Sequence, residues 1–414
     1  MRTGRLRHGF SVVLCAGVAL AAGCAPEPAG PDLRAADLAA TPWETIRAHA
    51  RGTTVHVGMW AGDEARNRFF QGPVTEAVAA ELGVTLRITP LADVADLVSK
   101  LLNERRAGRR SGGSIDVVWI NGENFRTARQ AGVLWGPFAD HLPNIVHYPD
   151  AAKHRDFGTD IDGFEAPWEV AQFVFAYDTA RITDPPRTLG ALRQWIERHP
   201  GRFTYPAVPD FTGSAFLRHV LVHASGLDPE AFLHFDEARY AAASARALDF
   251  LAAIRPHLWR GGETYPATPA DLNRLFVNHE IDFSMNYSPS FASDRIARGE
   301  FPETVRTFVL EEGTLSNYSY LAVPFNASNP AGALAVIDHL LSPAHALARV
   351  RAIGGLFPQS VESLTPGDRQ AVALLPRGPA TLAAETLARH RIPEPDAEYL
   401  VRFERDWLRE VLQQ

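Results

Sequence analysis

Two sequence periodicities alternate along residues 52–120, and this alternation limits the fold more than any other feature of the chain. Strand-like runs at residues 53–60, 84–88 and 114–120 are separated by helical stretches at residues 63–82 and 92–106. Within the second helical stretch the apolar positions recur at helical spacing: Val94, Leu97, Val98, Leu101 and Leu102. Strands joined through helices can run in the same direction in one sheet. The pattern therefore predicts an α/β fold with a mostly parallel sheet.

The second half of the chain continues with strands and helices in a less regular order. An extended segment is predicted at residues 166–177, a short strand at residues 201–205, and further strands at residues 281–286 and 319–323. Helices are predicted at residues 189–198, 212–224 and 330–341. The last segment, residues 396–414, has an apolar face made of Leu400, Phe403, Trp407, Val411 and Leu412. This segment is therefore predicted to be an amphipathic helix that packs on the folded body.

The N-terminus has the pattern of a lipoprotein export signal. Residues 1–23 combine a start rich in arginine with an apolar run that is short for a stable transmembrane helix. The run ends in small residues before Cys24, a pattern that resembles the lipobox at which a cysteine is acylated and becomes the mature N-terminus. The alternative is ordinary signal cleavage, which leaves a free thiol at Cys24. Residues 24–41 are rich in alanine and proline and are predicted to form a tether.

Charge and cysteine content exclude several classes of protein. The formal net charge is −7 over 414 residues, so there is no electrostatic reason to expect a nucleic-acid partner. Of the two cysteines, Cys15 lies in the segment that signal cleavage would remove. A single remaining cysteine excludes a disulfide scaffold, a structural zinc cluster and thiol catalysis.

Enzyme motifs are scarce in this chain. It contains no G-x-S-x-G motif, no Walker loop and no G-x-G-x-x-G motif after a strand. His219 and His223 are four residues apart on a predicted helix, but the residue after His219 is Val220 rather than the glutamate of zinc proteases. An exported metal-dependent hydrolase that uses this histidine pair is the alternative function. We expect no catalytic residue, no metal and no cofactor.

Several segments resemble, in the same order along the chain, the solute-binding subunits of ABC importers. Residues 114–125 (SIDVVWINGENF) are similar to the strand-to-helix turn that contacts the ligand in that family. Residues 166–177 are similar to its first interlobe crossover, and residues 281–288 to its second. Residues 313–325, followed by residues 329–341, are similar to its closing strand and helix.

A narrower set of strings is similar to the YnjB-type branch of this family: VSKLLNERRAG, SIDVVWINGENF, AGVLWGPFADHLPN and GGLFPQS. The resemblance covers residues 52–410. It implies a type II periplasmic-binding fold, in which two α/β lobes joined by two crossover strands close over a solute without altering it chemically. On this basis we expect a discontinuous first lobe at residues 42–167 plus 287–414, and a second lobe at residues 168–286.

Ligands of open α/β sheets bind at the carboxyl ends of strands and near helix N-termini, and this rule selects two turns in the first lobe. The first turn follows residues 53–60 and contains Trp60 and Gly62. The second turn contains Asn121, Gly122, Glu123 and Asn124. The glycine allows the backbone to approach a ligand closely, and the two amides can donate and accept hydrogen bonds. The alternative for the second turn is simple helix capping.

Three further segments complete the predicted binding site. Trp168 and Glu169 lie in the first crossover, where the tryptophan either stacks on a ring or cation of the solute or packs between the lobes. At the start of the predicted helix at residues 212–224 lie Asp210, Thr212, Gly213 and Ser214. This helix start would suit a polar or anionic group of the solute, and the alternative is that these residues only cap the helix. Asn286 and Tyr287 lie where the second crossover would deliver them to the cleft.

The sequence restricts the chemistry of the solute less than it restricts the position of the binding site. Aromatic rings with Glu123, Glu169 and Asp210 favour a cationic solute, thiamine-like or polyamine-like, whereas a helix start with hydroxyl groups favours an anion. We expect a small polar solute with a cationic part, an ABC permease in the cytoplasmic membrane as partner, and a monomer. We expect its lipid anchor on the outer face of the cell membrane, which is the periplasmic side if the cell has two membranes. A sensory protein that reports to a membrane kinase would share the fold.

Overall fold

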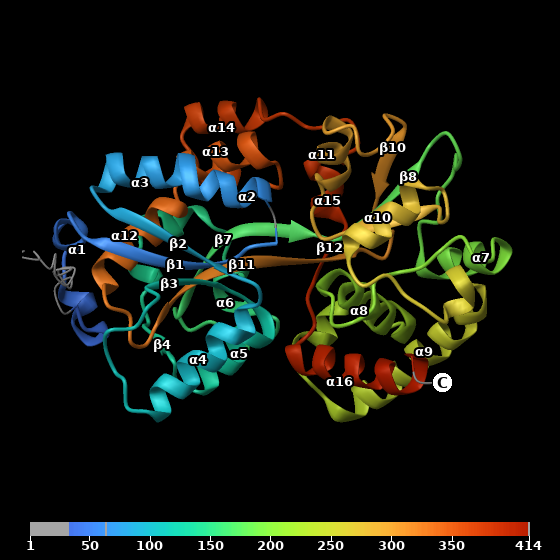
Figure 1. Ribbon diagram of the computed structural model, residues 1–414, viewed down its shortest axis with the longest axis horizontal. Helices are drawn as coiled ribbons and strands as arrows, with labels where there is room; N and C mark the ends of the chain where they lie inside the picture. Colours follow the sequence, from blue (N-terminus) through green and yellow to red (C-terminus); the bar gives the residue numbers. More distant parts are fainter. Residues whose placement is uncertain (1–32, 63, 413–414) are drawn as a thin grey trace, which may run out of the picture.

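The computed structural model describes residues 33–62 and 64–412, which form two lobes that lie side by side (Figure 1). The predicted export signal and Cys24 lie outside the described residues. Within the described ranges no single helix has the length and apolar composition needed to cross a membrane. One bent pair of helices, α12 (Pro330–Leu340) and α13 (Pro343–Ile353), meets that test by length and composition alone, and α12 is almost entirely buried in the first lobe.

The first lobe is built on one mixed sheet with the strand order β12-β11-β3-β1-β2, in which β4 and β7 also pair with β11. β1 runs parallel to β2 and to β3, as predicted, whereas β11 runs antiparallel to β3, β4 and β7. The strands are β1 (Thr54–Trp60), β2 (Thr85–Leu91), β3 (Val117–Ile120), β4 (Leu134–Trp135), β7 (Glu165–Gln172), β11 (Thr314–Pro324) and β12 (Arg391–Pro393).

Helices cover this sheet and connect its strands (Figure 1). They are α1 (Trp43–Ala50), α2 (Glu64–Phe69), α3 (Thr75–Leu82), α4 (Val94–Arg106), α5 (Gly122–Gln130), α6 (Ala151–His154), α12 (Pro330–Leu340), α13 (Pro343–Ile353) and α14 (Pro366–Ala373). The single helix predicted at residues 63–82 is interrupted by a π-helical turn, Phe70–Val74. Pro73 lies inside this turn, and because proline has no backbone N–H it disrupts the regular ladder of helical hydrogen bonds.

The predicted tether is shorter than expected where the structure describes it. Residues Ala35–Ala40 form a 3₁₀ helix, and Leu38 is 1% exposed in the core of the first lobe together with Leu33. A segment rich in alanine and proline still docks when a few leucines find an apolar surface. The tether prediction for residues 24–41 is therefore wrong for its second half.

The second lobe has a small antiparallel sheet in the order β10-β8-β9. Its strands are β8 (Val174–Asp178), β9 (Phe283–Asn286) and β10 (Val305–Phe308), and its helices are α7 (Leu189–Arg198), α8 (Phe211–Ser225), α9 (Glu237–Ile254), α10 (Pro269–Val277), α11 (Phe291–Ala297), α15 (Ala384–Arg389) and α16 (Ala397–Trp407). The strand predicted at residues 201–205 is not formed, although Phe203 and Tyr205 are fully buried.

Two strand segments connect the lobes, with a third connection at residues 374–379 after α14, and one of the strand segments differs from the prediction. Residues 166–177 pass from β7 in the first sheet to β8 in the second, which confirms the first predicted crossover. The second crossover at residues 281–288 is wrong, because β9 pairs with β8 and stays in the second lobe. The chain returns along β11 instead, whose Leu315 joins the core of the second lobe and whose Leu321 joins that of the first.

The C-terminal segment belongs to the second lobe, which changes the predicted lobe boundaries. Phe403 and Trp407 of α16 lie in the same core as α8 and α9, and the indole N–H of Trp407 donates to the hydroxyl of Tyr205 over 3.0 Å. Core residues of α11 and β10 lie there as well. Residues 287–313 and 380–412 therefore pack with the second lobe, although β12 within them also pairs with the start of β11 at the edge of the first sheet. The amphipathic face predicted a packing helix, but it contains no information about the surface that the helix covers.

Candidate functional site

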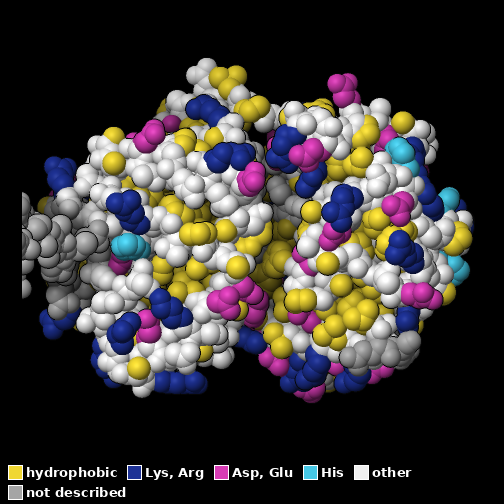
Figure 2. All heavy atoms as spheres, in the orientation of Figure 1, with side chains coloured by type: hydrophobic (Ala, Val, Ile, Leu, Met, Phe, Trp, Pro, Cys, Tyr) yellow, Lys and Arg dark blue, Asp and Glu magenta, His cyan; other side chains and the backbone are white. Residues whose placement is uncertain are grey.

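A groove runs between the two lobes on the surface seen in Figure 2, with hydrophobic side chains in its depth and acidic side chains beside its lower part. β1 and β3 are parallel neighbours, so the turns after Trp60 and after Ile120 emerge at the same edge of the first sheet. Phe157 links the second of these turns to the other lobe. Its ring lies against Gly122 on one side and 5.6 Å from the guanidinium carbon of Arg218 in α8 on the other.

Three tryptophans form an aromatic wall on the first lobe. The ring of Trp119 lies 6.3 Å from that of Trp60 and 5.5 Å from that of Trp168, nearly perpendicular to both. Trp60 is the exposed member, at 42%. Gly62 lies so close to the Trp60 ring that an added Cβ would be 2.0 Å from it. Gly62 therefore supports the indole by packing.

Trp168 does not reach the groove. It is 1% exposed and packs against Phe70 and Trp119 at 5.6 and 5.5 Å between ring centroids. Of the two interpretations of this residue, the structure places it in the packed core of the first lobe. The reason is that β7 is buried along nearly all of its length at the centre of the molecule.

The carboxylate of Glu169 forms ion pairs within the protein. Its carboxylate is buried, pairs with Arg66, and lies 3.4 Å from Nε of Arg349. The guanidinium of Arg66 lies above Trp119 at 5.1 Å from the ring centroid. Because two cations already face Glu169, this residue is a poor counter-charge for a cationic solute.

The Asn121–Asn124 turn keeps its polar side chains available. Asn121 occupies the N-cap position of α5, but its side chain makes no capping hydrogen bond. No hydrogen bond joins the side chains of Asn121, Glu123 or Asn124 to any residue within 33–62 and 64–412, and all three are partly exposed. Gly122 has a φ of +58°, a conformation that glycine adopts without strain. Helix capping therefore does not explain this turn.

The start of α8 is mostly explained by local structure. The carboxylate of Asp210 accepts hydrogen bonds from the backbone N–H groups of Thr212 and Gly213 over 2.9 and 3.0 Å, so the capping interpretation applies. A Cβ on Gly213 would lie 2.0 Å from the carbonyl oxygen of Pro206. Ser214 accepts from Arg218 over 2.7 Å. The unpredicted residue here is Phe211, which is 41% exposed.

A buried ion pair, Arg218–Glu394, lies next to the ring of Phe211. The guanidinium of Arg218 lies 5.2 Å from the Phe211 ring and donates to the carboxylate of Glu394 over 2.7 Å. The ring of Tyr287 packs against that of Phe211 at 5.1 Å and a 57° tilt, and its hydroxyl donates to Glu394. Burial raises the pKa of Tyr287 well above its ordinary value, so the phenol stays a neutral donor. Tyr287 therefore supports Phe211 from within the core.

Asn286 also has a local role. Its side-chain oxygen accepts a hydrogen bond from the backbone N–H of Ser288 over 2.9 Å, which stabilises the turn after β9. Because β9 is not a crossover, the sequence argument that placed Asn286 in the cleft no longer applies.

The histidine pair is engaged in packing. Nδ1 of His219 donates to the carbonyl of Ala215 over 2.7 Å, and Nε2 accepts from the N–H of Leu315 over 2.8 Å. His223 is hydrogen-bonded through Nε2 to the carbonyl of Gly313 over 3.0 Å. With both ring nitrogens of His219 occupied, the pair has no geometry for a metal ion. The described part of the chain holds no group of three or more His, Cys, Asp or Glu side chains placed to bind one.

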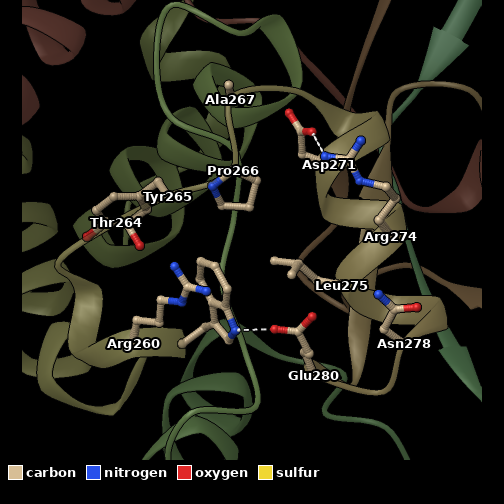
Figure 3. Close-up of a pocket in the computed structure, with 11 residues that line it drawn as sticks. Arg260, Thr264, Tyr265, Pro266, Ala267, Asp271, Arg274, Leu275, Asn278 and Glu280 are labelled. Carbon is tan, nitrogen blue, oxygen red and sulfur yellow. Dashed lines mark hydrogen bonds and ion pairs between the residues drawn. The ribbon is translucent and has the colours of Figure 1, made fainter.

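A separate surface pocket of about 360 Å³ lies on the second lobe (Figure 3). Its wall includes Arg260, Leu275 and the ring of Trp259, whose N–H donates to Glu280 across the pocket over 3.2 Å. None of the predicted binding residues lines it. The pocket is therefore distinct from the interlobe site.

Sequence reasoning missed several residues at the interlobe site, namely Arg66, Trp119, Phe157, Phe211, Arg218 and Glu394. Phe211 lies inside a segment that was selected, but no sequence signal separates an exposed aromatic ring from a buried one. Phe157 and Glu394 lie in short irregular segments with no recognisable motif. Arg218 contacts Phe157, Phe211 and Glu394, and Arg66 contacts Trp119, in each case between segments that are mostly distant in sequence.

Comparisons with known proteins agree with this architecture. Residues 74–375 match the family model of bacterial extracellular solute-binding proteins. The chain is 34% identical over 371 residues to Protein YnjB of Escherichia coli (strain K12), covering 89% of this chain and 94% of the relative.

Solved structures with similar folds have lower sequence identity. PotD, a spermidine/putrescine ABC transporter substrate-binding protein from Streptococcus pneumoniae, matches with a TM-score of 0.63 at 13% identity, covering 86% of this chain and 98% of its own. The Tp0655 lipoprotein of Treponema pallidum matches with a TM-score of 0.62 at 13% identity, covering 87% and 100%. These likenesses establish the two-lobed fold, and the family match together with the YnjB relative shows that this chain belongs to the bacterial extracellular solute-binding proteins.

Proposed function

We propose that this solute-binding protein is the lipid-anchored receptor of an ABC importer, and that it captures a small solute with a cationic group between its lobes. The observation that carries the proposal is the position of two aromatic rings. Among the described Phe, Trp and Tyr residues, Trp60 and Phe211 are the only exposed ones, at 42% and 41%. Trp60 ends β1 on the first lobe, and Phe211 begins α8 on the second. Exposed rings at both predicted ligand turns are the expected contacts for a solute.

Charge favours a cation over an anion. Glu123 has no partner among the described residues, whereas the buried arginines at the groove, Arg349 and Arg218, face the carboxylates of Glu169 and Glu394. The first N–H groups of α8, which would otherwise attract an anion, already bind Asp210. An ammonium group can interact with both the free carboxylate and the aromatic faces.

The structural neighbours are consistent with this chemistry without determining it. Two of them are named as spermidine/putrescine transport proteins, from Listeria monocytogenes and Streptococcus pneumoniae. Others with the same fold are named as a GABA receptor and as a protein with bound fructose-6-phosphate. The fold thus accommodates several solutes, and the charge distribution of this groove selects a polyamine-like or thiamine-like one. The protein binds this solute without chemical conversion and passes it to a permease in the cytoplasmic membrane.

A binding screen tests the solute class. The purified mature chain is examined by thermal shift and calorimetry with putrescine, spermidine and thiamine, and with glutamate and phosphate as anionic controls. We expect at least one cationic compound to raise the melting temperature, and Trp60→Ala and Phe211→Ala each to weaken its binding at least tenfold. Val146→Ala is the control variant, because Val146 is an exposed apolar residue that belongs to none of the predicted ligand turns. Stabilisation by the anions alone would overturn the assignment.

The anchor is tested separately. We propose that Cys24 is acylated and holds a monomer at the outer face of the cell membrane. The expression host should incorporate radiolabelled palmitate into the wild-type chain and not into Cys24→Ala, and the variant should be released from the membrane fraction. Equal labelling of both chains would contradict acylation at Cys24.

A further inference from the structure

A hairpin distant in sequence holds the backbone of the Asn121–Asn124 turn. The N–H of Gly122 donates to the carboxylate of Asp156. Asp156 belongs to the short strand β5 (Arg155–Asp156), which pairs with β6 (Thr159–Asp160). The ring of Phe157 lies 3.5 Å from the place where a Cβ of Gly122 would be, so one hairpin contacts the turn through both a charge and a ring.

The tip of this hairpin has an unusual backbone. Phe157 has a φ of +43° and Gly158 a φ of +78°. A bulky residue at positive φ is strained, and such strain persists only where surrounding contacts compensate for it. The Phe157 ring is 4% exposed and clusters with Ala397 and Leu400 of α16. The compensating contacts therefore come from the second lobe.

Backbone contacts fasten the tip to the second lobe as well. The N–H of Ala397, at the start of α16, donates to the carbonyl of Phe157 over 3.0 Å. A Cβ on Gly158 would lie 2.6 Å from the carbonyl oxygen of Leu233, so the two surfaces fit closely at this point. Beside the tip, Arg126 of α5 donates to Glu398 of α16 over 3.0 Å. The hairpin tip is thus part of the interface between the lobes.

We infer that Asp156 is a positioning residue that couples the order of the Asn121–Asn124 turn to the approach of the two lobes. When the tip is docked, Asp156 holds Gly122 in place, and the free side chains of the turn face the groove. When the tip separates from α16, the turn loses its support. The relevance of this coupling to solute capture rests on the proposed function, but the coupling itself does not depend on which solute binds.

The charges around Asp156 make the coupling sensitive to pH. Carboxyl groups face it from the neighbouring elements: Glu123 from α5, Glu165 from β7 and Glu394 from the segment before α16, with the phenol of Tyr320 from β11. Glu165 is fully buried, and neither of its oxygens has a hydrogen-bond partner among the described residues. Burial raises the pKa of Asp156 and of Glu165 well above their ordinary values. Acidification therefore protonates Asp156 and weakens its hold on Gly122.

Hydrogen exchange of the mature chain, without any solute, tests the coupling. Exchange is read at single amides by fragmentation mass spectrometry and corrected for intrinsic rates. We expect Asp156→Ala to raise exchange at Gly122 at least tenfold and to raise exchange at Ala397, on the other lobe. Asp156→Asn keeps an oxygen acceptor that does not ionise, so it should restore protection at Gly122 and remove the rise in exchange that acidification causes in the wild type. Faster exchange at Gly122 with no change at Ala397 would overturn the coupling.

A second variant approaches the same contact from the other lobe. Ala397 is the first helical residue of α16, and Asp396 before it has a ψ of 137°, so both positions are compatible with proline at residue 397. Ala397→Pro removes the N–H that binds Phe157 and leaves Gly122 untouched. We expect at least a fivefold rise in exchange at Gly122, and unchanged exchange there would refute the inference. Because no solute is present, a negative solute screen leaves this result intact.

Discussion

Trp168 and Trp60 provide a direct test of the difference between a packing and a binding tryptophan. Both belong to the aromatic wall of the first lobe, yet Trp168 is 1% exposed and Trp60 is 42% exposed. Replacing Trp168 by alanine removes an indole packed against Phe70 and Trp119. We therefore expect Trp168→Ala to lower the free energy of unfolding, and Trp60→Ala to leave it nearly unchanged.

The size of the effect follows from burial. A buried aromatic side chain removes about 200 Å² from water, which at about 25 cal/mol per Å² is worth about 5 kcal/mol. Alanine keeps part of this, so we expect a loss of about 3 to 5 kcal/mol for Trp168→Ala. The indole N–H of Trp168 has no hydrogen-bond partner among the described residues. Trp168→Phe should lower the free energy of unfolding by about 1.5 kcal/mol or less. It loses some packing contacts, but it also removes a buried N–H group that has no hydrogen-bond partner in the described part of the chain.

The assay is urea unfolding followed by far-UV circular dichroism, with the slope of the transition compared between variants. Trp60→Ala is the matched control and should change the free energy of unfolding by about 1 kcal/mol at most. The reasoning is refuted if Trp168→Ala unfolds within about 1 kcal/mol of the wild type, or if Trp60→Ala is equally destabilising.

Three further predictions concern buried ionisable side chains. Glu394→Leu leaves the fully buried Arg218 without its carboxylate, so urea unfolding should show a loss of about 3 to 5 kcal/mol, largely recovered when Arg218→Met is added; no recovery would contradict the pairing. Burial raises the pKa of Glu165 well above 4.5, so the stability that its neutral carboxyl contributes is lost as the pH rises above 4.5, and Glu165→Gln lacks this contribution to the pH dependence. The melting temperature of Glu165→Gln relative to the wild type should therefore increase as the pH rises above 4.5, and a constant difference would count against burial of a neutral carboxyl. Burial lowers the pKa of His219 well below 6.5, so only the unfolded wild type takes up a proton as the pH falls below 6.5; the stability deficit of His219→Gln at pH 8 should therefore shrink by pH 5, and a deficit that widens would exclude this explanation.

The elements were largely predictable because they depend on local interactions. The strands at residues 53–60 and 114–120 and the helices at residues 189–198 and 212–224 lie close to their predicted positions. Capping by Asp210 joins groups two and three residues apart, so the sequence contains all of its components. The family assignment also follows from local strings, since residues 114–125 comprise only β3 and the start of α5.

Burial and long-range pairing were not predictable in the same way. Trp168 and Phe211 both stand beside polar residues, and only the packed structure shows that the first is buried and the second exposed. Asp156 contacts Gly122 across 34 residues and through a hairpin with no motif. The return crossover on β11 depends on which strands pair with one another. The alternation of strand and helix patterns in the sequence predicts the strands but not their partners.

By itself the sequence determined the periodicity, the helix caps and the family to which this chain belongs, because each of these is encoded within a few neighbouring residues. The tertiary structure alone decided which lobe α16 completes, which aromatic rings are exposed, and which carboxylate holds the Asn121–Asn124 turn. These outcomes depend on the free energy of burying surfaces from distant segments against one another. That free energy is a property of the whole packed chain, and no local stretch contains it.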